Sequence, residues 1–207
     1  MKLLFLHGLG QGPESWNKVL EALGPDKTTA CPDLFGLCGD REVVYPALYS
    51  ALEDYAGGFA EPVLLCGLSL GAVLALDYAI RCPEKVAGLV LIAPQYKMPR
   101  TLLRLQNLVF RLMPERAFAG AGMGKRELIR LTSSMMFLDF RGKLDHVTCP
   151  TLILWGKRDA ANRRAARELA ELIPHGTMRE VAGAGHEVNL EAPQELAAAI
   201  RAFYERL

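Results

Sequence analysis

The sequence predicts an α/β fold in which a parallel β-sheet is covered by helices on both faces. Apolar runs of about five residues alternate with longer segments of helical periodicity. The apolar runs are continuous, which is typical of strands buried on both faces. The chain has 207 residues, of which 51% are hydrophobic, and this suffices for one domain (1–207) with a substantial core.

The elements follow one another in a regular order. The predicted strands are Lys2–Leu6, Lys27–Ala30, Pro62–Cys66, Val86–Ile92, Thr151–Trp155 and Thr177–Val181. The predicted helices are Pro13–Leu23, Arg41–Tyr55, Leu70–Arg81, Ala161–Ile173 and Pro193–Arg206. Because helices separate the strands, each helix is expected to connect two parallel strands.

One segment, residues 95–147, interrupts this alternation. It contains two helix-compatible pieces, Leu102–Met113 and Glu127–Phe140, and no evident strand. An insertion with its own helices is typical of a short lid over a site. An ordinary pair of packing helices is the alternative.

The bulk properties exclude several classes of protein. The net charge of +1 provides no global field for nucleic acid, and the sequence has no apolar run of about 18 residues for stable membrane insertion. The N-terminal apolar run is too short for a signal peptide. Five dispersed cysteines suit a reducing cytoplasm and have no metal-type spacing. We therefore expect a cytoplasmic monomer or homodimer that uses no cofactor and no metal.

The most informative motif is Gly67-Leu68-Ser69-Leu70-Gly71, which reads Gly-x-Ser-x-Gly. A predicted strand precedes it and a predicted helix follows it. A serine on such a sharp strand-to-helix turn is strained and presents its hydroxyl outward. The flanking glycines fit because a Cβ would clash where the backbone turns tightly.

Further reactive residues follow other predicted strands. Asp159 comes after Thr151–Trp155, and His186 comes after Thr177–Val181. Because ligands bind beyond the carboxyl ends of parallel strands, these side chains are expected to meet Ser69. His186 would act as the base for Ser69, and Asp159 would orient the imidazole. The backbone N–H groups of Leu9 and Leu70 are the candidate oxyanion donors.

Together these segments resemble the α/β-hydrolase-fold serine hydrolases. The matching pieces are His7-Gly8-Leu9-Gly10, Pro32-Asp33-Leu34-Phe35-Gly36, Gly67–Gly71, Cys149–Asp159 and Gly183-Ala184-Gly185-His186. The order serine, aspartate, histidine is that of the family. The resemblance implies a three-layer fold with a helical lid. Family members include carboxylesterases, enol-lactonases and C–C bond hydrolases.

The chain departs from the family pattern at its first strand. It begins at what would be the family's third strand, without the N-terminal antiparallel hairpin. We therefore expect a six-stranded parallel sheet with Lys27–Ala30 at one edge. The resemblance implies a hydrolase that cleaves a small ester or lactone through an acyl-enzyme on Ser69.

Two other functions stay open. The segment from Lys97 to Arg130 carries eight basic and two acidic residues, which favours a C–C bond hydrolase or lyase acting on a carboxylated substrate. A solvated helix face is the simpler explanation of this charge. A non-catalytic ligand-binding protein on the same scaffold is the other alternative.

Four residues are candidates for contact with the small-molecule substrate. Arg100 and Arg104 would supply positive charge from the lid. His7 follows the first strand, although a role in holding the oxyanion loop is the other interpretation. Trp16 is interpreted equally well as pocket lining or as core packing.

Overall fold

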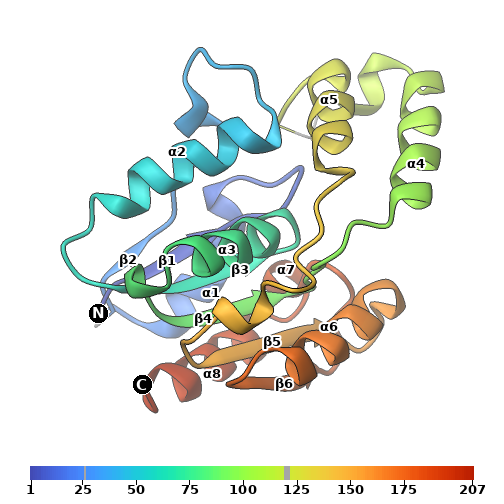
Figure 1. Cartoon of the computed structure of the whole chain (residues 1–207). Coiled ribbons are helices and arrows are strands. Elements are labelled where there is room, and N and C mark those ends of the chain that lie inside the picture. Colours follow the sequence, from blue (N-terminus) through green and yellow to red (C-terminus); the bar gives the residue numbers. More distant parts are fainter. Residues whose placement is uncertain (26, 119–121) are drawn as a thin grey trace.

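A six-stranded parallel sheet forms the centre of the protein (Figure 1). The computed structural model describes residues 1–25, 27–118 and 122–207. The strands are β1 (Leu3–Leu6), β2 (Thr29–Ala30), β3 (Val63–Leu68), β4 (Val86–Ile92), β5 (Thr151–Gly156) and β6 (Gly176–Val181). Their order across the sheet is β2-β1-β3-β4-β5-β6, with every pair parallel. The predicted six-stranded parallel sheet is confirmed, and the strand predicted at Lys27–Ala30 lies at one edge as Thr29–Ala30.

Helices cover both faces, which gives the predicted three layers. One face is covered by α2 (Tyr45–Gly57), α3 (Leu70–Arg81) and α6 (Ala160–Leu172), and the other by α1 (Asn17–Leu23) and α8 (Pro193–Tyr204). Successive strand side chains point to opposite faces, so Leu4 and Leu6 join the first core while Leu3 and Phe5 join the second. All four side chains are fully buried. Their burial fixes the register of the strands and therefore the position of the carboxyl edge of the sheet.

The observed boundaries differ from the prediction mainly at α2 and β2. The helix predicted from Arg41 begins at Tyr45. Pro46 fits the first turn because the N–H group that proline lacks would have no partner within the helix there. A short 3-10 turn, Gly36–Cys38, lies before it. At the sheet edge only Thr29 and Ala30 pair with β1, so β2 is shorter than expected. The predicted bounds of α3 and β4 agree with the structure.

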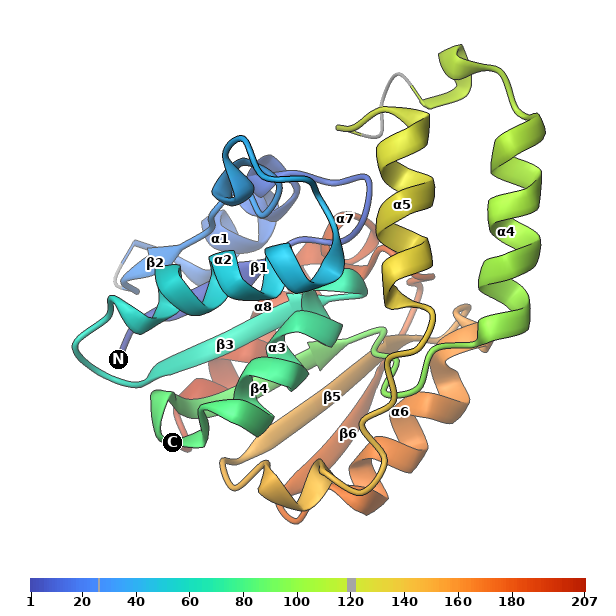
Figure 2. The same cartoon turned by 45° about the horizontal axis from the view of Figure 1, so that its top comes forward.

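The insertion (residues 95–147) contains α4 (Arg100–Leu112), a 3-10 turn at Glu115–Phe118 and α5 (Lys125–Met135). The two helices lie side by side and rise beyond the sheet (Figure 2). A buried amide joins them, since Asn107 Nδ2 donates to Ser133 Oγ (3.0 Å) and Thr132 Oγ1 donates to Asn107 Oδ1 (2.7 Å). Residues 119–121, within this segment, lie outside the described residues.

The insertion is anchored to the rest of the protein at two places. The backbone N–H of Tyr45 in α2 donates to Ser134 Oγ of α5 (2.9 Å). Its entry and exit run antiparallel, because Met98 N donates to Leu138 O (3.1 Å) and Phe140 N donates to Tyr96 O (2.9 Å). The second predicted helix therefore ends at Met135, and the chain passes through a turn at 136–137 into the antiparallel bridge at Asp139 instead of staying helical to Phe140.

None of the helices within the described ranges combines the length and the apolar character needed to cross a membrane.

Candidate active site

The serine motif forms a strained turn between β3 and α3. Ser69 has φ +52°, in the left-handed region that a non-glycine residue occupies at a cost of about 1–3 kcal/mol. A Cβ on Gly67 would overlap the carbonyl of Gly71, and a Cβ on Gly71 would overlap the carbonyl of Leu6. The two glycines therefore allow α3 to start close against β1 and β3, which holds the serine at the carboxyl edge of the sheet.

Ser69, His186 and Asp159 meet at this edge. His186 Nε2 lies 3.0 Å from Ser69 Oγ, and His186 Nδ1 lies 2.9 Å from Asp159 Oδ2. The three residues come from the ends of β3, β6 and β5, and are 117 and 27 positions apart along the chain. The convergence that the sequence predicted at one sheet edge is present as a continuous chain of hydrogen bonds.

The electrostatics of the pair suit an ionised acid beside an imidazole of increased basicity. Burial would raise the pKa of Asp159, but hydrogen bonds from His186 and Asn162 outweigh it and hold that pKa below its usual value. The hydrogen bond to Asp159 raises the pKa of His186 above 6.5, against the opposing effect of burial. With its Nδ1 proton donated to Asp159, the imidazole leaves Nε2 free to accept a proton from Ser69.

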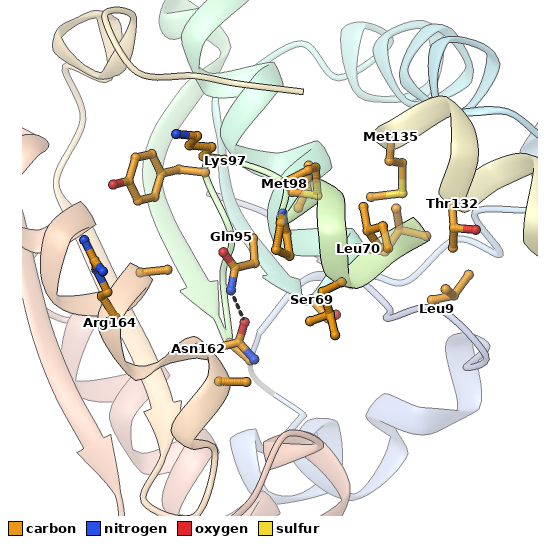
Figure 3. Close-up of a pocket in the computed structure, with 18 of the residues that line it drawn as sticks. Leu9, Ser69, Leu70, Gln95, Lys97, Met98, Thr132, Met135, Asn162 and Arg164 are labelled. Atoms are coloured by element: carbon orange, nitrogen blue, oxygen red, sulfur yellow. Dashed lines mark hydrogen bonds between the residues drawn. The ribbon is translucent and has the colours of Figure 1, made fainter. Parts of the chain in front are cut away.

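A cavity of about 700 Å³ opens above Ser69 and His186, between the sheet edge and the insertion. Figure 3 shows Ser69 near its centre, with Met135, Thr132 and Leu9 toward one end and Lys97 and Arg164 toward the other. Its walls are mostly apolar. The apolar side chains that line it include Leu9, Leu70, Val73, Met98, Leu102, Leu103, Met135, Ala161 and Ala165.

Leu9 and Leu70 both line the cavity beside Ser69. Leu9 lies in the loop after β1, and Leu70 is the first residue of α3. Within the described part of the chain, neither backbone N–H donates a hydrogen bond to another protein group. Both donors are thus available where charge would develop on a bound carbonyl oxygen.

The loop after β1 is held from behind by His7. His7 is fully buried and does not line the cavity, so a substrate contact for it is wrong. Burial lowers the pKa of His7, which keeps the ring neutral. Its Nδ1–H donates to Gly8 O (3.0 Å), and its Nε2 accepts from the Leu34 N–H (3.0 Å). This agrees with the alternative interpretation, in which His7 positions the loop that carries Leu9.

Trp16 also lies away from the cavity. It is fully buried and packs against Phe5, with ring centroids 5.0 Å apart. Of its two interpretations, core packing is correct, because the 3-10 turn at Pro13–Trp16 directs the indole beneath the sheet beside α1.

Arg100 and Arg104 of the insertion do not line the cavity either. The Arg100 guanidinium lies over the Phe137 ring, 5.0 Å from its centroid, and Arg104 is exposed. Both positions of α4 face away from the cavity. The cations that do line it are Lys97, Arg141 and Arg164. The helical period did not show which face of α4 turns inward.

Two amide side chains beside Asp159, those of Asn162 and Gln95, were not predicted from the sequence as part of the site. Asn162 Nδ2 donates to Asp159 Oδ2 (2.7 Å), and Gln95 Nε2 donates to Asn162 Oδ1 (2.7 Å; Figure 3). Asn162 is three residues after Asp159, a spacing that suits contact across the first turn of a helix. This spacing was the available signal for Asn162; Gln95 had none, since only the fold brings it to α6.

No group of side chains suited to hold a metal ion is found within residues 1–25, 27–118 and 122–207. The thiols are not competing nucleophiles, since burial raises the pKa of Cys66 and raises that of Cys31 to about 12.

The fold and this arrangement of side chains define the class of the protein as an α/β hydrolase. The model of the alpha/beta hydrolase family matches residues 3–199; the chain belongs to this family and is a hydrolase.

Individual relatives are more distant. The chain is 28% identical to a pimeloyl-(acyl-carrier protein) methyl ester esterase of Chromobacterium violaceum, across 99% of this chain and 98% of that protein. It is 27% identical to the biotin biosynthesis bifunctional protein BioHC of Teredinibacter turnerae, across 97% of this chain. The chain spans only 44% of the length of that bifunctional protein.

Among solved structures, a thermophilic esterase from Thermogutta terrifontis superposes with a TM-score of 0.81. The match covers 100% of this chain and 90% of the esterase at 21% sequence identity, and therefore shows the fold alone.

Proposed function

We propose that this hydrolase cleaves a small ester or lactone through an acyl-enzyme on Ser69. The observation that carries the proposal is the chain Ser69–His186–Asp159, with 3.0 Å and 2.9 Å between successive side chains. A serine hydroxyl is a weak nucleophile unless a base lies within hydrogen-bond reach. Here the base also has an ionised carboxylate on its second nitrogen.

In the first half of the reaction, Ser69 Oγ attacks the carbonyl carbon of the ester while His186 Nε2 takes the hydroxyl proton. The Leu9 and Leu70 N–H groups stabilise the oxyanion of the tetrahedral intermediate, each contributing about 3 kcal/mol. His186 then gives its proton to the leaving alkoxide oxygen as the C–O bond breaks. The products of this half are a free alcohol and Ser69 acylated on Oγ.

In the second half, water attacks the acyl carbon while His186 takes one of its protons. The bond from the acyl carbon to Ser69 Oγ breaks, and His186 returns the proton to Ser69. Asp159 stays ionised throughout and stabilises the imidazolium that forms in each half.

The apolar cavity supports a small substrate with hydrocarbon character on at least one side of the ester. A volume of about 700 Å³ is in the ordinary range for small-molecule sites. The names of the relatives add support for ester cleavage, because a methyl ester esterase covers nearly the whole chain in the comparison.

The test is turnover of a p-nitrophenyl ester of a short acyl chain. The wild type is expected to hydrolyse it, and Ser69→Ala to retain only the background rate. Equal turnover by Ser69→Ala would contradict the assignment of the nucleophile. No turnover of any ester or lactone by the wild type, together with measurable ligand binding, would favour the non-catalytic binding protein.

A second candidate uses the same three residues on a carboxylated substrate, as a C–C bond hydrolase or lyase. It is favoured by Lys97, Arg141 and Arg164 along the cavity wall. Arg141 is paired with Asp139 (2.7 Å) and Arg164 with Glu168 (2.8 Å), which leaves one positive charge uncompensated. Exposed pairs of this kind are weak, so a substrate carboxylate could replace either partner.

The monomethyl and dimethyl esters of one dicarboxylic acid test the carboxylate recognition on which the second candidate depends, since they differ by a charge. If a carboxylate is recognised, Lys97→Met should lower kcat/KM for the monoester by about 5-fold and leave the diester unchanged. Arg100→Gln is the matched control, because Arg100 is a cation of the same insertion that does not line the cavity. Equal kcat/KM for both esters in the wild type would argue against an anionic substrate.

A further inference from the structure

Asn162 holds the triad acid by two contacts at the start of α6. Its backbone N–H donates to Asp159 Oδ1 (3.3 Å), and its side-chain Nδ2 donates to Asp159 Oδ2 (2.7 Å). Both residues are 7% exposed, so water cannot readily replace these donors. The two oxygens of the carboxylate are therefore fixed from one residue, which limits rotation of the Asp159 side chain.

The donors to Asp159 Oδ2 converge from two sides. His186 Nδ1 is 2.9 Å from this oxygen and Asn162 Nδ2 is 2.7 Å from it. The two nitrogens are 3.1 Å apart, so both crowd the same oxygen. The imidazole position therefore depends on where Asn162 holds the oxygen.

Gln95 determines which end of the Asn162 amide faces the acid. Its Nε2 donates to Asn162 Oδ1 at 2.7 Å, so the Asn162 NH₂ group is left to point at Asp159. Gln95 lies on the segment that leaves β4 for the insertion, and it lines the cavity (Figure 3). The hydrogen bonds thus run without a break from the cavity wall through Asn162, Asp159 and His186 to Ser69.

We propose that Asn162 is a positioning residue for the Asp159–His186 pair and that Gln95 acts through it by fixing the orientation of its amide. This rests on the proposed function, because it concerns the same serine hydrolysis. An Asp159 carboxylate that rotates away carries the imidazole with it, and a displacement of about 1 Å can cost roughly 100-fold in rate. Asn162 also lines the cavity, but its side chain is engaged by Asp159 and Gln95, so the main effect is expected on kcat.

The test compares Asn162→Ala, Gln95→Ala, Gln95→Glu and the double variant Asn162→Ala/Gln95→Ala on the p-nitrophenyl ester. Asn162→Ala should lower kcat about 10- to 100-fold with little change in KM. Gln95→Glu has nearly the same shape but cannot donate to Asn162 Oδ1. The Gln95→Glu variant should fold normally. In it the Asn162 amide should turn round and kcat should fall. Gln194→Glu makes the same chemical change at an exposed position of α8 and should leave kcat unchanged.

The double variant distinguishes a connected chain from two separate structural defects. If Gln95 acts only through Asn162, the double variant should be no slower than Asn162→Ala, because the losses are not additive. Multiplied losses would overturn the role of Gln95, and a wild-type kcat for Asn162→Ala would overturn the whole proposal.

The pH profile provides a readout that a loss of stability would not change. Asn162→Asp places a second carboxylate beside His186, which should move the acid limb of kcat/KM to higher pH. The other carboxylates near His186 are Asp159, Glu187 and Glu191, and they are the same in every variant. An unshifted acid limb would mean that the residue does not face the imidazole as proposed.

Failure of the two proposals can be told apart. If Ser69→Ala and Asp159→Asn abolish turnover but Asn162→Ala and Gln95→Glu do not, only the positioning role is wrong. If Ser69→Ala keeps full turnover, the proposed function fails and this inference fails with it.

Discussion

The carboxyl edge of the sheet and the insertion above it place their side chains in different ways. At the sheet edge, Ser69, Asp159 and His186 each follow a buried strand, so the strand register fixes where they lie. In the insertion, side-chain directions depend on how two amphipathic helices pack. There Asn107 is buried, while Leu105 and Leu112 on the same helix are exposed. The proposed chemistry therefore depends on strand register, whereas the proposed substrate contacts also depend on how the insertion packs.

The largest effects are expected from substitutions of the three residues at the sheet edge, Ser69, Asp159 and His186. His186→Ala or Asp159→Asn should lower kcat by about 10,000-fold, because the serine loses its base or the base loses its correct tautomer. Steady-state turnover of a p-nitrophenyl ester measures this. Losses below about 10-fold would mean that the sheet edge is not where the chemistry occurs.

The close backbone packing at the sheet edge can be tested at Gly71. Gly71→Ala places a Cβ against the carbonyl of Leu6 and should lower the free energy of unfolding by about 3 kcal/mol. Urea denaturation followed by circular dichroism measures it. Gly57→Ala, near the end of α2 where a Cβ meets no atom, is the control and should be neutral or slightly stabilising. Equal stability of the two variants would contradict the close approach.

His7 links stability to the oxyanion loop. His7→Leu leaves the Leu34 N–H and the Gly8 carbonyl without their partner, which should cost about 2 kcal/mol of unfolding free energy. The same denaturation experiment measures it, with the exposed His175→Leu as control. If His7→Leu is as stable as His175→Leu, His7 does not hold the loop.

The pH dependence follows from the raised pKa of His186. The imidazole must be neutral to act as a base, so kcat/KM should fall about 10-fold per pH unit below the pKa of His186, which lies above 6.5. Asp159→Asn removes the carboxylate that raises this pKa, so in that variant the acid limb should move to lower pH. An acid limb at the same pH in both proteins would mean that the pair is not coupled.

The smallest effects are expected on the outer face of the insertion. Arg100→Gln and Arg104→Gln should leave kcat/KM for a neutral ester unchanged, because neither residue lines the cavity. Their unfolding free energies should stay within about 0.5 kcal/mol of the wild type. A clear loss of activity in either variant would place the substrate on this face of α4.

Much of the fold and the three strand-end residues could be predicted from the sequence, for a physical reason. Strand burial produces continuous apolar runs, and parallel strands end at one edge, so the residues after the runs at Val63–Leu68 and Thr151–Gly156 had to lie near one another. The helix from Leu70 to Arg81 was equally clear, since the segment is rich in helix-forming residues.

The substrate-contact residues were predicted less well, because they depend on tertiary packing. Nothing local separates Trp16 in the core from a pocket tryptophan, or Arg164, which lines the cavity, from Arg104, which does not. Gln95 illustrates the same limit: it meets Asn162, 67 positions away, only because the fold brings the segment after β4 to the first turn of α6.

The central claim is that His186 activates Ser69, and covalent labelling tests it most directly. The protein is incubated briefly with a fluorophosphonate, digested, and the modified peptide is identified by mass spectrometry. We expect one phosphonylated residue, Ser69, in the wild type and in Arg100→Gln, with labelling strongly slowed in His186→Ala and absent in Ser69→Ala. Labelling at another residue, or equal labelling of Ser69 in His186→Ala, would contradict it.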